Sequence, residues 1–114
     1  MKRKYRLRRN SDFQHVRQVG KSYASPILVL AFLQNELDHS RFGFVVNKRL
    51  GKAVHRNKIK RRMREAVRLQ VEQIKPGFDL VFIARKPANQ ATYAEIATAI
   101  THLLKTANLI HISG

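Results

Sequence analysis

The sequence contains no cysteine, and only 7 of its 114 residues are acidic. The absence of cysteine excludes disulfide bonds and thiolate metal sites, which fits a reducing compartment. A nuclease that cleaves with two metal ions needs clustered carboxylates to hold the ions about 4 Å apart. The acidic residues are instead scattered along the chain, at Asp12, Glu36, Asp38, Glu65, Glu72, Asp79 and Glu95. We therefore predict that the polypeptide binds a partner, and we expect no metal site of its own.

Long hydrophobic runs and the motifs of common enzymes are also missing. No apolar stretch reaches the roughly 20 residues of a transmembrane helix. Polar residues interrupt the segment after the basic N-terminus, where a signal peptide would need an apolar core. Phosphate-binding loops, dinucleotide fingerprints and nucleophile elbows do not occur. The histidines have no metal-ligand spacing, although a metal-free nuclease built from histidines that meet only in the folded chain stays open. We expect a soluble, cytoplasmic protein with no catalytic residue and no membrane partner.

Positive charge dominates the composition. The chain has 23 lysine and arginine residues and a formal net charge of +16. This charge opposes folding through self-repulsion and points to a strongly anionic partner. On charge alone, this partner could be RNA, DNA or an anionic membrane surface. With 114 residues, of which 44% are hydrophobic, the chain can form one domain around one core. We expect one domain over residues 1–114, in which residues 1–10 form a basic, partly flexible arm.

Local signals predict a helix near each end of this domain. Ser11 followed by Gln14 is a capping box, and Gly20 would end the first helix after about residue 19. A second capping box, Thr92 with Glu95, begins a helix with one apolar face near the C-terminus.

Apolar runs between these helices predict the strands. Residues 22–24 are a possible short strand, and residues 27–33 and 41–46 are expected to pair as a hairpin. Gly43 inside the second of these strands marks a close backbone approach. Another strand is predicted over residues 78–84. The order is helix, two or three strands, helix, strand, helix, which is an α+β fold.

The densest positive charge lies in a helix predicted to begin after Lys52 and to end near Lys75, before Pro76 and Gly77. At 100° per residue its apolar residues fall on one side, namely Ile59, Met63, Ala66, Val67, Val71 and Ile74. The opposite side carries Asn57, Arg61, Arg64 and Arg68. Like charges at this spacing destabilise an isolated helix, so a polyanion such as nucleic acid is the predicted partner of this face.

The same helix carries a family motif. Arg56-Asn57, Lys60-Arg61 and Arg64 have the spacing R-N-x-x-K-R-x-x-R, with Gly51 and Ala53-Val54 before them. This pattern resembles the RNR motif of the protein subunit of bacterial ribonuclease P. Arg6-Leu7, Asp12-Phe13 and residues 83–88 are similar to other segments of that family. The resemblance extends from about residue 4 to about residue 109.

The resemblance implies a single RNA-binding domain with the order αβββαβα and helices on a mostly antiparallel sheet. It also implies a left-handed β-α-β crossover through the basic helix. Chain geometry alone predicts the opposite, because about 98% of such crossovers are right-handed.

The resemblance further implies a subunit of an endoribonuclease that removes the 5′ leader of precursor tRNA. Its RNA subunit would carry the Mg²⁺-dependent chemistry, and the partners would be ribonuclease P RNA and precursor tRNA, with no obligate protein partner evident. By position, the residues facing the catalytic RNA are Arg56, Asn57, Lys60, Arg61, Arg64 and Arg68. The leader-binding residues, in a cleft between the first helix and the sheet, are Phe13, Val16, Arg17 and Lys48. Arg17 stands where the family often has an aromatic residue, and Ala31 stands where a strand tyrosine is common.

Two other functions are compatible with the same charge and helix. A ribosomal or other structural RNA-binding protein would lack the leader cleft, and a DNA-binding protein would insert the basic helix into a major groove. The DNA alternative has less support, because no helix-turn-helix or dimer seam is evident.

Overall fold

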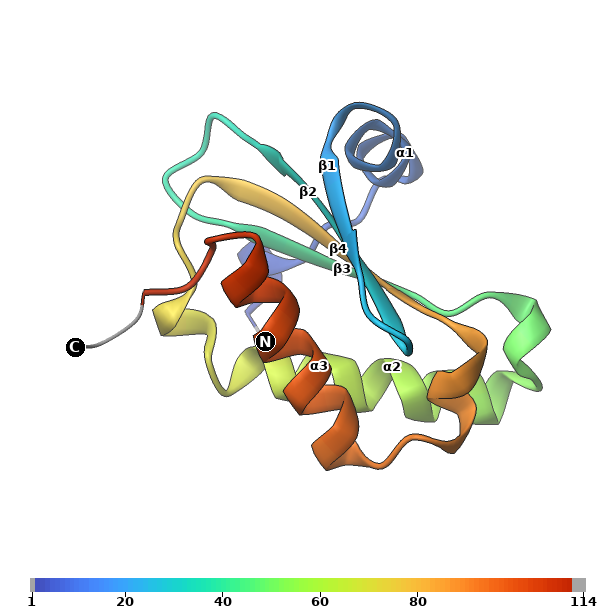
Figure 1. The fold of residues 1–114 in the computed structure, drawn as a ribbon. Helices are drawn as coiled ribbons and strands as arrows, with labels where there is room; N and C mark the ends of the chain where they lie inside the picture. The colour runs from blue at the N-terminus through green and yellow to red at the C-terminus, as the bar shows by residue number, and fades with distance from the viewer. Residues whose placement is uncertain (1, 112–114) are drawn as a thin grey trace.

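A four-stranded sheet separates one helix from two others in the computed structural model, which describes residues 2–111 (Figure 1). The helices and strands, in chain order, are α1 (Asn10–Val19), β1 (Lys21–Ala24), β2 (Leu28–Gln34), β3 (Arg41–Val45), α2 (Ala53–Arg68), β4 (Phe78–Ala84) and α3 (Tyr93–Thr106). Short 3₁₀ turns join them, namely η1 (Arg3–Tyr5), η2 (Lys48–Leu50), η3 (Val71–Gln73) and η4 (Lys86–Gln90). The α+β class and the element order αβββαβα are confirmed.

The strand order is β1-β2-β4-β3, so the predicted hairpin of β2 with β3 is wrong. β4 lies between them, antiparallel to β2 and parallel to β3. The reason is burial, because β4 is apolar on both of its faces and loses most exposure as a central strand. The two pairs that involve β2 are antiparallel, which agrees with a mostly antiparallel sheet.

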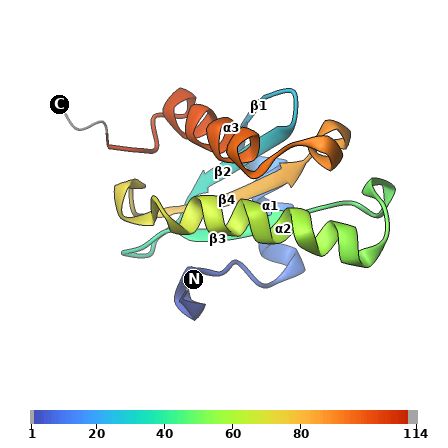
Figure 2. The same ribbon diagram turned by 90° about the horizontal axis from the view of Figure 1, so that it is seen from below.

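The parallel pair is joined through α2. Seen from the α2 side in Figure 2, β3 runs toward the right, α2 returns toward the left in front of the sheet, and β4 lies above β3. This path is a left-handed crossover. The prediction from the family resemblance is therefore confirmed, and the right-handed crossover predicted from chain geometry alone is wrong.

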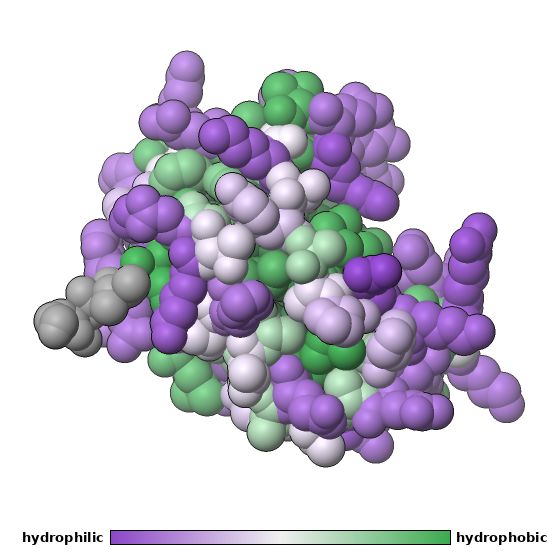
Figure 3. All heavy atoms as spheres, viewed as in Figure 1, coloured by the Kyte–Doolittle hydropathy of each residue, from purple (hydrophilic) through white to green (hydrophobic). Residues whose placement is uncertain are grey.

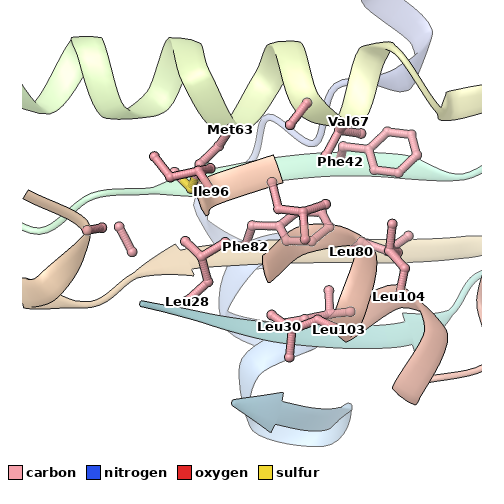
Figure 4. Packing of buried hydrophobic residues seen from close by; sticks show 14 of the residues in the cluster. Leu28, Leu30, Phe42, Met63, Val67, Leu80, Phe82, Ile96, Leu103 and Leu104 are labelled. Atoms are coloured by element: carbon pink, nitrogen blue, oxygen red, sulfur yellow. The ribbon is translucent and has the colours of Figure 1, made fainter. Parts of the chain in front are cut away.

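The main core lies between the sheet and the pair α2 and α3 (Figure 4). The predicted apolar face of α2 is confirmed, since its residues Ile59, Met63, Ala66 and Val67 are all buried. α3 contributes Ile96, Ile100, Leu103 and Leu104. These residues pack on the side chains that β2, β3 and β4 direct toward the helices, among them Leu30, Phe42 and Phe82.

α2 ends at Arg68, seven residues before the predicted end near Lys75. The chain turns instead through η3, and Ile74 forms an isolated β-bridge with Ile110 beyond α3. The Lys75 N–H donates to the Leu109 carbonyl at 2.7 Å. This pairing needs an extended backbone, so the helix cannot continue to Lys75. The apolar residues Val71 and Ile74 keep the helical spacing of the sequence but lie outside the helix.

A smaller cluster lies on the opposite face of the sheet, under α1. Leu7, Val16, Ala31 and Val81 are buried there, with Phe13 partly buried against them. The Leu7 N–H donates to the Phe42 carbonyl at 2.8 Å, and Arg6 forms a parallel β-bridge with Phe42. The end of the predicted basic arm is therefore held along the edge of β3, while Met1 lies outside the described residues.

The first capping box does not form. Arg9 occupies the N-cap position without a side-chain hydrogen bond, and Ser11 is already inside α1. The hydrogen bond between Leu7 and β3 fixes where the chain enters α1, and α1 therefore begins earlier than the capping box indicates. Gly20 does end α1, but with a φ of −74°. A Cβ at this position would overlap the Phe32 carbonyl, so close packing explains the glycine.

Candidate RNA-binding surface

The outer face of α2 presents the residues of the predicted RNA contact. Asn57, Arg61 and Arg68 are exposed, whereas Arg64 is half-buried. They lie opposite the buried residues of α2, because the helix docks on its sheet through the apolar face. The orientation of the helix that the sequence predicts is thus correct.

Several basic side chains of α2 already have partners within the protein. The Arg68 Nε donates to Glu65 Oε2 at 2.9 Å, and Arg68 Nη2 donates to Oε1. These hydrogen bonds, together with the opposite charges, lower the pKa of Glu65 and raise the pKa of Arg68. Both groups stay charged near neutral pH, and Arg68 enters any RNA contact with its guanidinium already bound.

Two further arginines of α2 bind backbone carbonyls. Arg56 Nε donates to Gly51 O at 3.0 Å, across a turn in which Gly51 has a φ of +124°. Arg62 Nη1 donates to Ala91 O at 3.1 Å and so ties α2 to the segment before α3. The sequence did not predict this role of Arg62, because the partner is 29 residues away and is a main-chain atom.

Arg64 has a different kind of partner. Its guanidinium carbon lies 5.9 Å from the centroid of the Phe44 ring. Phe44 in turn stacks on Phe82, with ring centroids 5.8 Å apart and an interplanar angle of 13°. Arg61 and Arg64 have no ion pair within residues 2–111, so their N–H groups are available to a ligand.

A groove of about 380 Å³ runs beside this face, between α1 and the edge strand β3. It is lined by Asn10, Phe13, Gln14, Arg17, Phe44, Val45, Val46 and Lys60. Lys60 comes from α2, so the helix that carries the arginines also closes one side of the groove. Lys60, predicted for the RNA contact, and Phe13 and Arg17, predicted for the leader cleft, therefore line the same groove.

Phe13 lies on the wall of the groove formed by α1 and is only partly buried. A Cβ at Gly43 would overlap its ring, which means that the ring lies directly on the backbone of β3. The close approach predicted at Gly43 is confirmed, and the approaching group is Phe13.

The other predicted leader residues occupy different places. Arg17 is exposed and lines the groove. Val16 is 1% exposed beneath α1, so it supports the helix and offers no surface to a ligand, which corrects its prediction as a contact residue. Lys48 lies in η2, outside the lining of the groove. Ala31 is buried in the same cluster as Val16.

An ion-pair network holds α1 against the sheet. Arg41 donates to both carboxylate oxygens of Asp79, at 2.9 and 2.7 Å, and Asn35 Nδ2 donates to Asp79 Oδ1 at 2.9 Å. Arg41 also lies 3.9 Å from the Asp12 carboxylate of α1. The hydrogen bonds to Asp79 raise the pKa of Arg41 further above its ordinary value. No sequence signal links these residues, because the parallel pairing of β3 and β4 brings them together.

The described residues do not form a metal centre. No group of three histidine or acidic residues within positions 2–111 could hold an ion. Two histidines have polar partners of another kind, since His39 Nδ1 lies 2.9 Å from Asp38 and His55 Nε2 lies 3.0 Å from Asn89. In this part of the chain, no helix is both long enough and apolar enough to cross a membrane.

Comparison with known proteins identifies the family of this chain. A family model described as ribonuclease P matches residues 1–108. The chain belongs to the ribonuclease P protein family. The ribonuclease P protein component of Alkaliphilus oremlandii is 44% identical over 111 residues, which cover 97% of either chain. That of Roseiflexus castenholzii is 46% identical over 111 residues, covering 96% of this chain and 91% of the relative.

Solved structures of the family have the same fold. The ribonuclease P protein of Staphylococcus aureus superposes with a TM-score of 0.87 at 40% identity, covering 94% of this chain and 98% of that chain. The protein from Thermotoga maritima gives a TM-score of 0.82 at 36% identity, covering 96% and 98%.

The ribonuclease P family assignment decides the function class. The chain is a protein subunit of the endoribonuclease ribonuclease P and takes part in tRNA 5′ processing. As a protein component of that enzyme it associates with ribonuclease P RNA. Nothing in these similarities favours the ribosomal or DNA-binding alternative.

Proposed function

We propose that this subunit binds ribonuclease P RNA through the outer face of α2 and holds the 5′ leader of precursor tRNA in the groove beside Phe13. The observation that carries the proposal is the continuity of the two surfaces. Lys60 belongs to the basic helix and lines the groove, and Phe44 lines the groove while lying under Arg64. One RNA surface can therefore continue into a second, narrower site for a single strand.

The groove has the chemistry that single-stranded RNA requires. Aromatic faces stack on unpaired bases, and a basic lining follows the phosphates. Phe13 supplies a partly exposed ring, while Arg17 from α1 and Lys60 from α2 supply positive charge in the same groove. Arg17 stands where the family often has an aromatic residue. We therefore propose that this subunit binds the leader with one stacking ring, and with more electrostatic attraction than a relative that has an aromatic residue at this position.

We propose that Mg²⁺ is held by the RNA subunit or at the RNA interface and supplies the hydrolytic chemistry there. The carboxylates beside Arg41 offer little to a metal ion. Asp79 accepts hydrogen bonds from Arg41 through both oxygens, and Asp12 faces the same guanidinium. The role of the chain is then to bind and to orient the RNA.

The test compares precursor tRNA with mature tRNA, which lacks the leader, on holoenzyme reconstituted with Phe13→Ala. A base stacked on an aromatic ring is worth about 1–3 kcal/mol, so binding of precursor tRNA should weaken roughly 5- to 150-fold. Binding of mature tRNA should hardly change. Fluorescence titration of both ligands measures the difference.

Loss of packing is the competing explanation, because Phe13 rests on Gly43. Phe13→Leu keeps an apolar side chain over that glycine and removes the aromatic face, so it should show the same selective loss. Circular dichroism at the titration temperature establishes that both variants are folded. Equal weakening for precursor and mature tRNA would show that Phe13 acts only as a packing residue.

A further inference from the structure

Phe44 occupies an unusual position at the edge of the sheet. Its register partner in β4 is Phe82, which is fully buried, and the two rings are stacked. The Arg64 guanidinium carbon lies 5.9 Å from the centroid of the Phe44 ring. Phe44 is itself only partly buried. An aromatic ring anchored in the core thus reaches the RNA-binding face of α2.

The contact with Phe44 leaves Arg64 free to bind. A cation above an aromatic face is attracted by the ring quadrupole, and this attraction uses none of the five N–H donors of a guanidinium. Within residues 2–111, no hydrogen bond or ion pair engages those donors. Arg68, one turn further along α2, is the opposite case, because Glu65 already accepts its hydrogen bonds.

We propose that Phe44 is a positioning residue for RNA binding, which holds the Arg64 guanidinium at the border of the groove with its donors directed to an RNA phosphate. This inference rests on the proposed RNA face of α2. A free arginine side chain loses rotamer freedom when it binds, and an arginine already placed on a ring loses less. Stacking on Phe82 fixes the Phe44 ring, so packing in the core determines where the Arg64 guanidinium lies.

An aromatic residue is not required at this position for packing alone. A leucine would fill the partly buried site over Phe82 and keep the strand apolar, but it has no quadrupole. Phe44→Leu therefore separates the two roles. Phe44→Tyr keeps the aromatic face and serves as the conservative variant.

The experiment is a titration of the full chain with ribonuclease P RNA alone, without tRNA, so that direct leader contacts cannot contribute. Phe44→Leu should weaken binding by about 2- to 5-fold, which corresponds to a cation–π contact at an exposed site. Phe44→Tyr should bind within about 1.5-fold of the natural chain. Where Phe44→Leu does not melt cooperatively above the titration temperature, Phe44→Met takes its place with the same expectation.

A double-mutant cycle gives the decisive result. In an Arg64→Ala background, Phe44→Leu should have no further effect on binding, whereas in the matched Arg61→Ala background its full effect should persist. Equal effects of Phe44→Leu in both backgrounds, or no effect in the natural chain, would overturn the inference while leaving the proposed function intact. Failure of the natural chain to bind the RNA would overturn both.

Discussion

Arginines on one helix face are not equivalent, because the neighbours of each decide how many of its donors a ligand can use. Along α2, Arg61 is unpaired within the described residues and Arg64 rests on a ring, while Arg68 is bound by Glu65. The hydrogen bonds from Arg68 hold the pKa of Glu65 below its ordinary value, so the pair persists throughout the neutral range. An RNA phosphate must compete with this carboxylate for Arg68.

Glu65→Gln should therefore strengthen binding of ribonuclease P RNA. The change removes a negative charge that faces a polyanion and releases two donors of Arg68. We expect an increase in affinity of roughly 2- to 5-fold at low salt, because exposed ion pairs are weak. Titration of the RNA with each protein at one fixed ionic strength measures the effect.

Glu72→Gln is the matched control, since it changes the net charge equally. Glu72 is exposed in η3 and has no ion pair among the described residues. Glu72→Gln should increase the affinity for ribonuclease P RNA less than Glu65→Gln does. Equal increases would mean that net charge, and not the release of Arg68, explains the result.

At the scale of elements, capping boxes of the same type have different outcomes at α1 and α3. Thr92 accepts a hydrogen bond from the Glu95 N–H at 3.1 Å, and Glu95 accepts one from the Thr92 N–H at 2.9 Å. Ser11 makes no such bond, because anchoring of the preceding segment to β3 starts α1 two residues earlier, with Arg9 at the N-cap position. The sequence motif is present in both places, and tertiary contacts decide which one forms.

Thr92→Ala should lower the free energy of unfolding by about 1 kcal/mol, the usual cost of losing an N-cap side chain. Ser11→Ala is the control and should change it by at most a few tenths, because no cap is lost. Denaturant titration at neutral pH measures both. Equal losses would contradict the difference between the two helix starts.

The same box predicts a pH dependence. The backbone N–H and the hydroxyl of Thr92 lower the pKa of Glu95 in the folded protein below its ordinary value of 4.5. A carboxyl with a lowered folded pKa stabilises fully above the unfolded pKa, and this stabilisation is lost as the pH falls through the folded pKa. The stability of the natural chain relative to Glu95→Gln, which cannot ionise, should therefore fall below about pH 4.5 in denaturant titrations.

At the scale of the whole molecule, positive charge is distributed unevenly. Residues 22–34 and 87–104 contain no lysine or arginine in a chain with 23 of them. These segments contain β2 and most of α3, which pack together in the core. Figure 3 shows the strongly hydrophilic side chains mainly around the rim of this view and paler residues at its centre. The basic residues are therefore concentrated on the N-terminal arm, on α2 and in the segment that leads into α2.

Binding of ribonuclease P RNA should accordingly depend steeply on salt. If about six phosphates are neutralised, the logarithm of the binding constant should fall against the logarithm of salt concentration with a slope near −4 to −5. Titrations between about 50 and 300 mM monovalent salt at fixed Mg²⁺ measure the slope. A slope shallower than about −2 would show that charge contributes little to the association.

Local and periodic features of this protein were determined by its sequence. The apolar face of α2, the capping box of α3 and the family motif each depend on residues near one another in the chain. Such features involve short-range geometry, so a helical period or a turn signal predicts them directly.

Only the tertiary structure decided which strands pair and what the groove contains. The position of β4 between β2 and β3 depends on how much apolar surface each arrangement buries, and local patterns do not specify that sum. Placement of Arg64 on Phe44 and of Arg41 on Asp79 follows from this strand order. The basic residues could be listed from the sequence, but their binding capacity was set by neighbours that only the folded chain brings into contact.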